Sequence, residues 1–92
     1  MEVEEFAEKF ASMANLPKYK SGLKKIAEDY YEEALYEDDD SDTMEEVATD
    51  IQNLLANEPN LNEKSSELLN SFFDLISEQK YLIIMDIYYQ SS

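Results

Sequence analysis

The sequence lacks the residue types on which most enzyme active sites depend. Its 92 residues include no Cys, no His, no Arg and a single Gly. Without Cys there are no disulfides, thiolate zinc sites or thiol nucleophiles. Without His, the usual proton shuttle and the commonest transition-metal ligand are both missing. Without Arg there is no bidentate phosphate clamp, and one Gly leaves no phosphate-cradling loop. We therefore expect a protein that is not an enzyme and that uses no cofactor and no metal.

Charge and length narrow the class further. The chain carries 22 acidic residues against seven Lys, for a formal charge of −15, which disfavours direct binding to nucleic acid. Its length suits one domain over residues 1–92, and seven Tyr and four Phe supply apolar bulk that a disordered acidic tail lacks. The longest apolar stretch, Tyr81 to Tyr89, is about half of the roughly twenty residues that span a membrane. We expect a soluble cytoplasmic protein with no transmembrane segment.

Apolar residues recur at helical spacing along most of the chain. The spacing predicts an all-α antiparallel four-helix bundle with short loops. The predicted core stripes run over Val3–Ala14, Leu23–Leu35, Met44–Leu55 and Leu61–Ile76, and they include Met13, Tyr30 and Met44.

Polar residues and Pro mark the expected helix ends. Asn15 and Pro17 end the first helix, because the residue before a Pro is pushed out of the α region. Thr43 and Glu46 fit a capping box at the start of the third helix. Asn60 precedes the fourth helix, with Glu63 three residues later.

The C-terminal stretch Tyr81–Tyr89 is the ambiguous segment. It is rich in β-branched and aromatic residues, as strands are, but no other segment offers a strand partner. We expect an apolar C-terminal extension, either a continuation of the fourth helix or a short fifth helix that packs on the bundle. Its apolar area exceeds what one helix face hides, so it either completes the core or forms a contact surface.

Twelve carboxylates and no basic residue lie between Glu28 and Asp50. Asp38, Asp40 and Asp42 occupy the first, third and fifth positions of an EF-hand pattern, but Thr43 and Thr49 stand where Gly and Glu are required, so a calcium loop is rejected. Two interpretations remain. The carboxylates either imitate a row of phosphates and occupy the nucleic-acid groove of another protein, or form a solvated helix face and loop.

Four lysines, Lys18, Lys20, Lys24 and Lys25, lie within eight residues. They could contact anionic lipid or an acidic partner. Lys24 and Lys25 also precede Glu28 and Asp29 by four residues, which predicts local ion pairs on one helix face.

In its helix order and spacing, the chain resembles the cytosolic immunity proteins of the enterocin A/pediocin group, which protect bacteria from their own class II bacteriocins. The resemblance runs from about Phe6 to Lys80. It rests on Lys18–Leu23 leading into a Leu/Ile/Tyr helix, on Glu46–Leu55, and on Asn60–Leu61 followed by Glu67–Ile76.

The resemblance implies a cytoplasmic antiparallel four-helix bundle that reaches the membrane only through a protein partner. That partner would be the permease of a mannose-type sugar phosphotransferase system with bacteriocin bound. The C-terminal half of such proteins carries specificity, which here implies partner contacts by Phe73, Tyr81, Ile84, Tyr88 and Tyr89. The acidic residues Asp38, Asp39, Asp40 and Asp42 would tune that specificity.

Two other functions are compatible with the sequence. A small acidic inhibitor of the phage type would mimic nucleic acid, lose its partner steeply with salt and depend on the same four aspartates. An accessory subunit would bury its C-terminal segment in an obligate partner.

Overall fold

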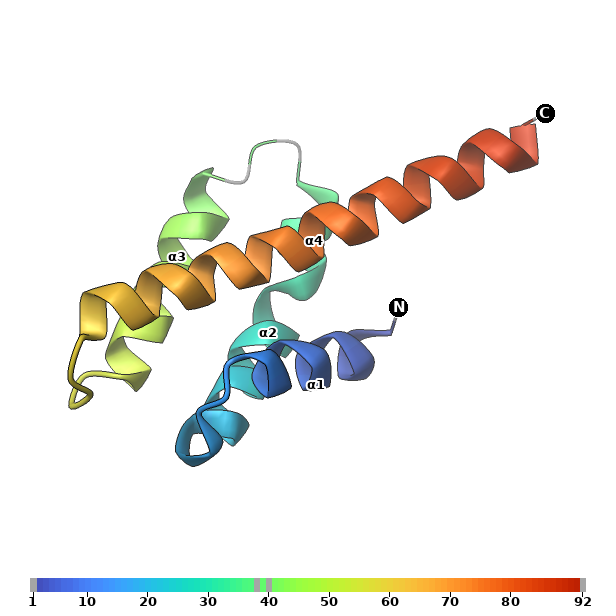
Figure 1. The fold of residues 1–92 in the computed structure, drawn as a ribbon. Coiled ribbons are helices and arrows are strands. Elements are labelled where there is room, and N and C mark those ends of the chain that lie inside the picture. Colours follow the sequence, from blue (N-terminus) through green and yellow to red (C-terminus); the bar gives the residue numbers. More distant parts are fainter. Residues whose placement is uncertain (1, 38, 40, 92) are drawn as a thin grey trace.

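Four α-helices joined by short connections build the molecule (Figure 1). The computed structural model describes residues 2–37, 39 and 41–91, which contain α1 (Val3–Met13), α2 (Lys20–Tyr36), α3 (Ser41–Leu54) and α4 (Leu61–Ser91). A 3₁₀ turn, η1 (Pro17–Tyr19), links α1 to α2. Helix α4 contacts α1, α2 and α3. The predicted all-α antiparallel bundle is confirmed.

The helices enclose one apolar core, to which each contributes one stripe. The predicted periodicity is largely confirmed, because most residues of the four stripes are buried or partly buried. The largest apolar side chains without exposure are Phe6, Phe10, Leu23, Val47, Ile51, Leu55, Phe72 and Ile76.

Aromatic rings join α1, α2 and α4 within this core. Phe72 makes edge-to-face contacts with Phe6 and Phe10, with ring centroids 5.4 and 5.5 Å apart. Phe6 also packs on Tyr31 at 4.5 Å. Edge-to-face pairs contribute roughly 0.5–1.5 kcal/mol beyond the burial of their area.

Two predicted core positions are wrong, and a third lies only at the edge of the core. Met13 and Met44 are 53% and 41% exposed, since Met13 lies in the last turn of α1 and Thr43 occupies the buried position beside Met44. Tyr30 lies at the edge of the core, where its hydroxyl donates to Asp50 Oδ2 at 2.7 Å. Tyr31 is buried in its place.

The predicted capping box of α3 is also wrong. Helix α3 begins at Ser41, whose backbone N and Oγ both donate to Asp39 Oδ1, at 3.0 and 2.7 Å. Thr43 is therefore inside the first turn, where its buried hydroxyl donates to Glu33 Oε1 of α2 at 3.0 Å. Because Asp39 accepts the hydrogen bonds at the start of α3, the Thr43 hydroxyl is available to bond to Glu33 and so join α3 to α2.

Two asparagines with positive φ stand at the predicted helix boundaries. Asn15 (φ 52°) follows the end of α1, and Asn60 (φ 58°) precedes α4. Asn adopts this left-handed region more readily than most residues with a Cβ. The Asn60 carbonyl accepts the first α4 hydrogen bond from Lys64 N at 3.0 Å.

Gly22 permits a close approach of α2 and α3. A Cβ on Gly22 would lie 2.5 Å from Leu54 Cδ1, so any larger residue requires the Leu54 side chain to move. Here the absence of a side chain allows Leu54 to pack directly on the backbone of α2.

Ion pairs tie α1 to α2, and one joins Glu58 of the α3–α4 connection to Lys64 of α4 at 3.1 Å. Lys20 Nζ and Lys24 Nζ lie 2.9 and 3.0 Å from the two carboxylate oxygens of Glu8. The expected Lys24–Glu28 pair is thus replaced by one across the helix interface, while Lys25 pairs with Asp29 at 3.8 Å as predicted.

The Glu8 ion pairs predict a specific pH dependence of stability. Hydrogen bonds from Lys20 and Lys24 lower the pKa of Glu8 from 4.5 to about 2. A lowered folded-state pKa stabilises the fold above the unfolded pKa, and this contribution is lost as pH falls through about 2. The melting temperature of Glu8→Gln should therefore lie below that of the natural protein above about pH 5, with a gap that closes near pH 2.

Thermal melts of both proteins from pH 2 to pH 7 measure this gap. Glu78→Gln, on the exposed side of α4, is the control and should follow the natural profile. A gap that persists undiminished at pH 2 would mean that the Glu8→Gln substitution disturbs packing and that the ion pairs contribute nothing.

Ser65 carries a buried hydroxyl with no hydrogen-bond partner in the described part of the chain. An unpaired buried hydroxyl costs roughly 1–3 kcal/mol, and Ala also has the higher helix propensity. We expect Ser65→Ala to raise the free energy of unfolding by about 1 kcal/mol. Urea denaturation measures the change, and a loss of stability would contradict this account.

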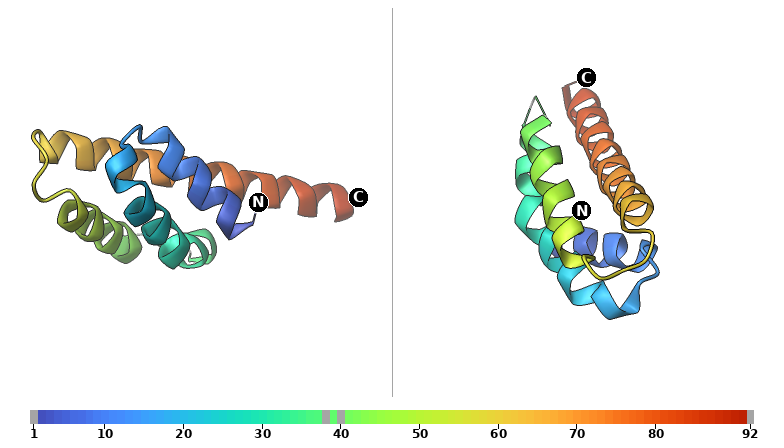
Figure 2. Two further views of the ribbon diagram at one scale, coloured as in Figure 1. Left: turned by 90° about the horizontal axis from the view of Figure 1, so that it is seen from below. Right: turned by 90° about the vertical axis from the view of Figure 1, so that its left-hand side faces the viewer.

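Helix α4 is much longer than the bundle that it completes. Its 31 residues span about 46 Å, whereas the 17 residues of α2 span about 26 Å. The molecule measures 51 × 24 × 19 Å, and its radius of gyration of 13.9 Å exceeds the roughly 12 Å of a compact chain of this length. Figure 2 shows the C-terminal part of α4 running past the other helices.

Candidate functional site

The C-terminal stretch continues α4 without a break. Residues 77–91 contain neither Pro nor Gly, the two residue types that most often interrupt a helix. The polar residues from Ser77 to Lys80 are compatible with the middle of a helix. Of the two expected forms, the continuation is confirmed, and no separate fifth helix forms within residues 61–91.

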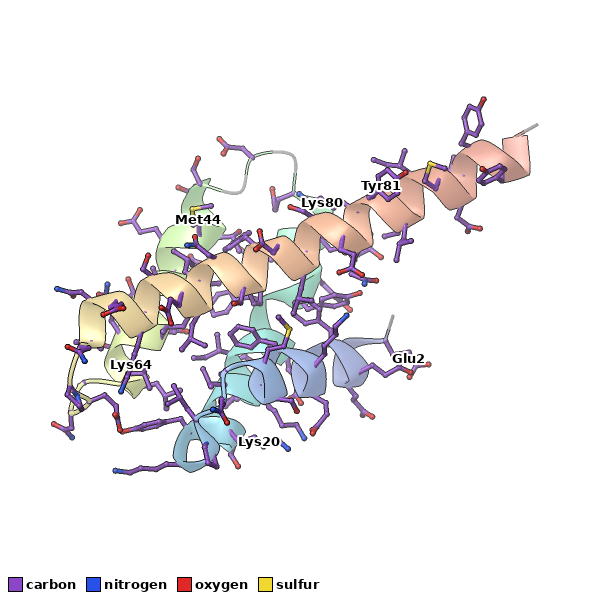
Figure 3. All side chains as sticks on the ribbon, in the orientation of Figure 1. Glu2, Lys20, Met44, Lys64, Lys80 and Tyr81 are labelled. Carbon is purple, nitrogen blue, oxygen red and sulfur yellow. The ribbon has the colours of Figure 1, made fainter. Side chains whose placement is uncertain are left out.

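Residues Lys80 to Ile84 of α4 lie against the end of α2. Lys80 Nζ donates to the backbone carbonyl of Glu37, just beyond the end of α2, at 3.3 Å. Ile83 and Ile84 then line a small groove with Leu35 and Tyr36 of α2. In Figure 3, α4 continues well beyond the labelled Lys80 and Tyr81.

Beyond Lys80, most of the apolar side chains are exposed. We call residues 81–89 the projecting segment. Six of its side chains are between 52% and 68% exposed, namely Tyr81, Leu82, Ile84, Ile87, Tyr88 and Tyr89. The expectation that a separate element packs back on the bundle is therefore wrong. Helices α1 and α2 are too short to cover these six side chains.

The structure brings together four of the five apolar residues that were expected to contact a partner. Tyr81, Ile84, Tyr88 and Tyr89 all belong to the projecting segment, and the rings of Tyr88 and Tyr89 meet edge to face at 5.8 Å. Phe73 precedes Tyr81 by eight residues and therefore lies about 12 Å from it along the axis of α4. It is partly buried against the core, with its ring 5.0 Å from that of Phe72.

The acidic candidates fall at the start of α3. Asp39 accepts both hydrogen bonds from Ser41, which lower its pKa, so its carboxylate already has a structural role. Asp42 is exposed in the first turn of α3. Asp38 and Asp40 lie outside the described residues.

Carboxylates of α2 and α3 face one another beside these aspartates. The charge of Glu33, followed by burial and the charges of Asp42 and Asp50, raises the pKa of Glu46. The hydroxyl of Tyr30 donates to Asp50, which raises the pKa of Tyr30 to about 12. Among the described residues, no group of acidic side chains has the arrangement of a metal site. This face is an anionic surface with no evident chemistry.

Two buried residues near the projecting segment escaped the sequence prediction. Tyr31 and Gln79 are 6% and 3% exposed, and both line a groove between α1, α2 and α4. Periodicity alone does not distinguish Tyr31 from Tyr30, and Gln79 is polar, so neither had a local pattern that marked it as buried.

Helix length and hydropathy also bear on the membrane. No helix among the described residues has an apolar stretch long enough to cross a bilayer. The projecting segment is therefore a short apolar helix end attached to an acidic body.

Comparisons of the chain with protein-family models, with curated proteins and with solved structures find no match.

Proposed function

We propose that the protein is a non-enzymatic binding protein of the bacteriocin-immunity type, which protects the cell that produces it. Its proposed partner is a membrane permease of the mannose-type sugar phosphotransferase class with bacteriocin bound, reached from the cytoplasm. The observation that carries the proposal is the exposed apolar projecting segment of α4.

The area of this segment suits a contact site. Aromatic side chains present roughly 150–250 Å² each, so Tyr81, Tyr88 and Tyr89, at 61–68% exposure, leave roughly 300–500 Å² accessible. The largest apolar patch on an ordinary monomer is roughly 300–600 Å² and is often functional. The isoleucines of the segment add further apolar area. A protein partner that buries this surface gains its main driving force from it.

The shape of the segment suits insertion between the helices of a partner. Asp86 is the one charged residue among residues 81–89, so the segment is apolar over most of its circumference. A helix of this kind is stable when it is surrounded by other apolar elements. The bundle behind the segment contributes most of the formal charge of −15, which opposes approach to an anionic lipid surface. Attachment through a protein partner therefore fits the charge better than attachment to lipid.

Expression in a bacterium that is sensitive to class II bacteriocins tests the proposal. Cells that make the protein are challenged with a panel of pediocin-like peptides, and survival against one peptide but not the others is the expected result. Uniform killing of cells that contain folded protein would refute the immunity function.

A second function has one observation in its favour. The raised pKa of Glu46 indicates carboxylates crowded on the α2–α3 face, as phosphates are along nucleic acid. A nucleic-acid mimic would bind a nucleic-acid-binding protein with an affinity that falls steeply between low and moderate salt. A pull-down at two salt concentrations separates this function from apolar binding by the projecting segment.

A further inference from the structure

An open groove lies beside the base of the projecting segment, with which it shares only Ile83. Its volume is about 540 Å³, which is in the range of ligand-binding pockets. The apolar and aromatic lining comes from three helices: Val3 of α1, Tyr31, Leu35 and Tyr36 of α2, and Ile83 of α4. The buried Gln79 completes the floor.

Carboxylates surround this apolar floor. Glu2 and Glu4, at the start of α1, and Glu32 of α2 line the same groove, and all three are exposed. In Figure 3, Glu2 lies at the N-terminal end of α1, below the part of α4 that carries Lys80 and Tyr81. None of the three carboxylates forms an ion pair with a described residue, whereas Glu8, Asp29 and Glu58 do. The groove therefore presents negative charge that is available to a ligand.

Charge rules out two occupants from this chain. A second copy carries the same formal charge of −15 and would bring further acidic side chains to an acidic rim. Three of the four lysines in the basic cluster before and within α2 already form ion pairs, because Lys20 and Lys24 bind Glu8 and Lys25 binds Asp29.

The walls of the groove favour a helical ligand over an extended one. They are helices whose backbone groups are largely hydrogen-bonded internally, so a strand would find no edge to pair with. A helix satisfies its own backbone and needs only a surface for its side chains. The exposed ring of Tyr36 also offers a face to a cationic side chain.

We propose that this groove binds a cationic amphipathic helix. The apolar stripe of the helix lies on Val3, Tyr36 and Ile83, above the buried Tyr31 and Leu35. Its basic residues pair with Glu2, Glu4 and Glu32. The inference depends on the groove alone, so it holds or fails independently of the immunity function.

A 14-residue peptide of Leu and Lys arranged at helical period is the probe. Titration into the ¹⁵N-labelled full chain should shift the amides of Val3, Tyr31, Tyr36, Gln79 and Ile83 and induce helix in the peptide. A peptide with Glu at every Lys position should not bind. Shifts confined to residues 84–89, or no binding of the Lys peptide, would overturn the proposal.

Matched charge variants distinguish binding of the peptide in the groove from a general attraction of a cationic peptide to an acidic protein. Glu2→Gln, Glu4→Gln and Glu32→Gln together should weaken the Lys peptide at least about tenfold. Glu45→Gln, Glu63→Gln and Glu67→Gln remove the same charge from exposed sites on α3 and α4 and should change the affinity less than about twofold. Equal losses in the two triple variants would overturn the proposal.

Discussion

Replacing Phe72 by alanine is expected to lower the free energy of unfolding by about 3–5 kcal/mol. The Phe72 side chain has no exposed surface and makes edge-to-face contacts with Phe6 and Phe10 of α1. The substitution removes the ring that joins α4 to α1 and leaves a cavity that surrounding residues fill only in part. A domain of this size has a total stability of roughly 5–14 kcal/mol, so the variant loses a large share of it.

Urea denaturation followed by circular dichroism measures this loss. Phe73→Ala is the matched control, because the neighbouring Phe73 ring is only partly buried and packs against the outside of Phe72. We expect the control to lose less than half as much stability. Equal losses at the two positions would show that Phe72 is not the centre of the aromatic cluster.

The spacing of apolar residues was sufficient to predict the helices and most of the core. In α4, for example, the stripe through Leu68, Phe72, Leu75 and Ile76 is buried as its helical period required. This succeeds because each helix buries one face, so burial follows a local repeat. The prediction failed where two adjacent side chains suited the same face, as with Tyr30 and Tyr31.

The placement of the C-terminal stretch could not be read from the sequence. Its composition showed more apolar area than one helix face can hide, which left open whether Tyr81, Ile84, Tyr88 and Tyr89 complete the core or form a contact surface. Whether these residues cover the core depends on the lengths of α1 and α2 and on where each begins relative to α4. Those are relations between distant segments, and the groove between α1, α2 and α4 was missed for the same reason.

A variant with Gln at positions 81, 84, 88 and 89 is expected to lose protection completely while remaining folded. Gln is polar and neutral and has a helix propensity close to that of Leu, so the substitutions keep both the helix and the net charge. All four side chains are more than 60% exposed, so the free energy of unfolding should change by less than about 1 kcal/mol. Apolar and aromatic residues at the centre of a contact often contribute roughly 1–2 kcal/mol or more each, so the partner's affinity should fall by about 100-fold or more.

The protection assay and thermal melts together measure this effect, and two double variants make it specific. Tyr88→Gln with Tyr89→Gln removes two rings from the projecting segment, whereas Met13→Gln with Met44→Gln removes two exposed apolar side chains from α1 and α3. Protection should fall sharply in the first double variant and persist in the second. Because both keep the formal charge of −15, neither outcome can arise from altered electrostatics. If the fourfold variant still protects cells, the projecting segment has no part in binding and the partner must contact the acidic bundle instead.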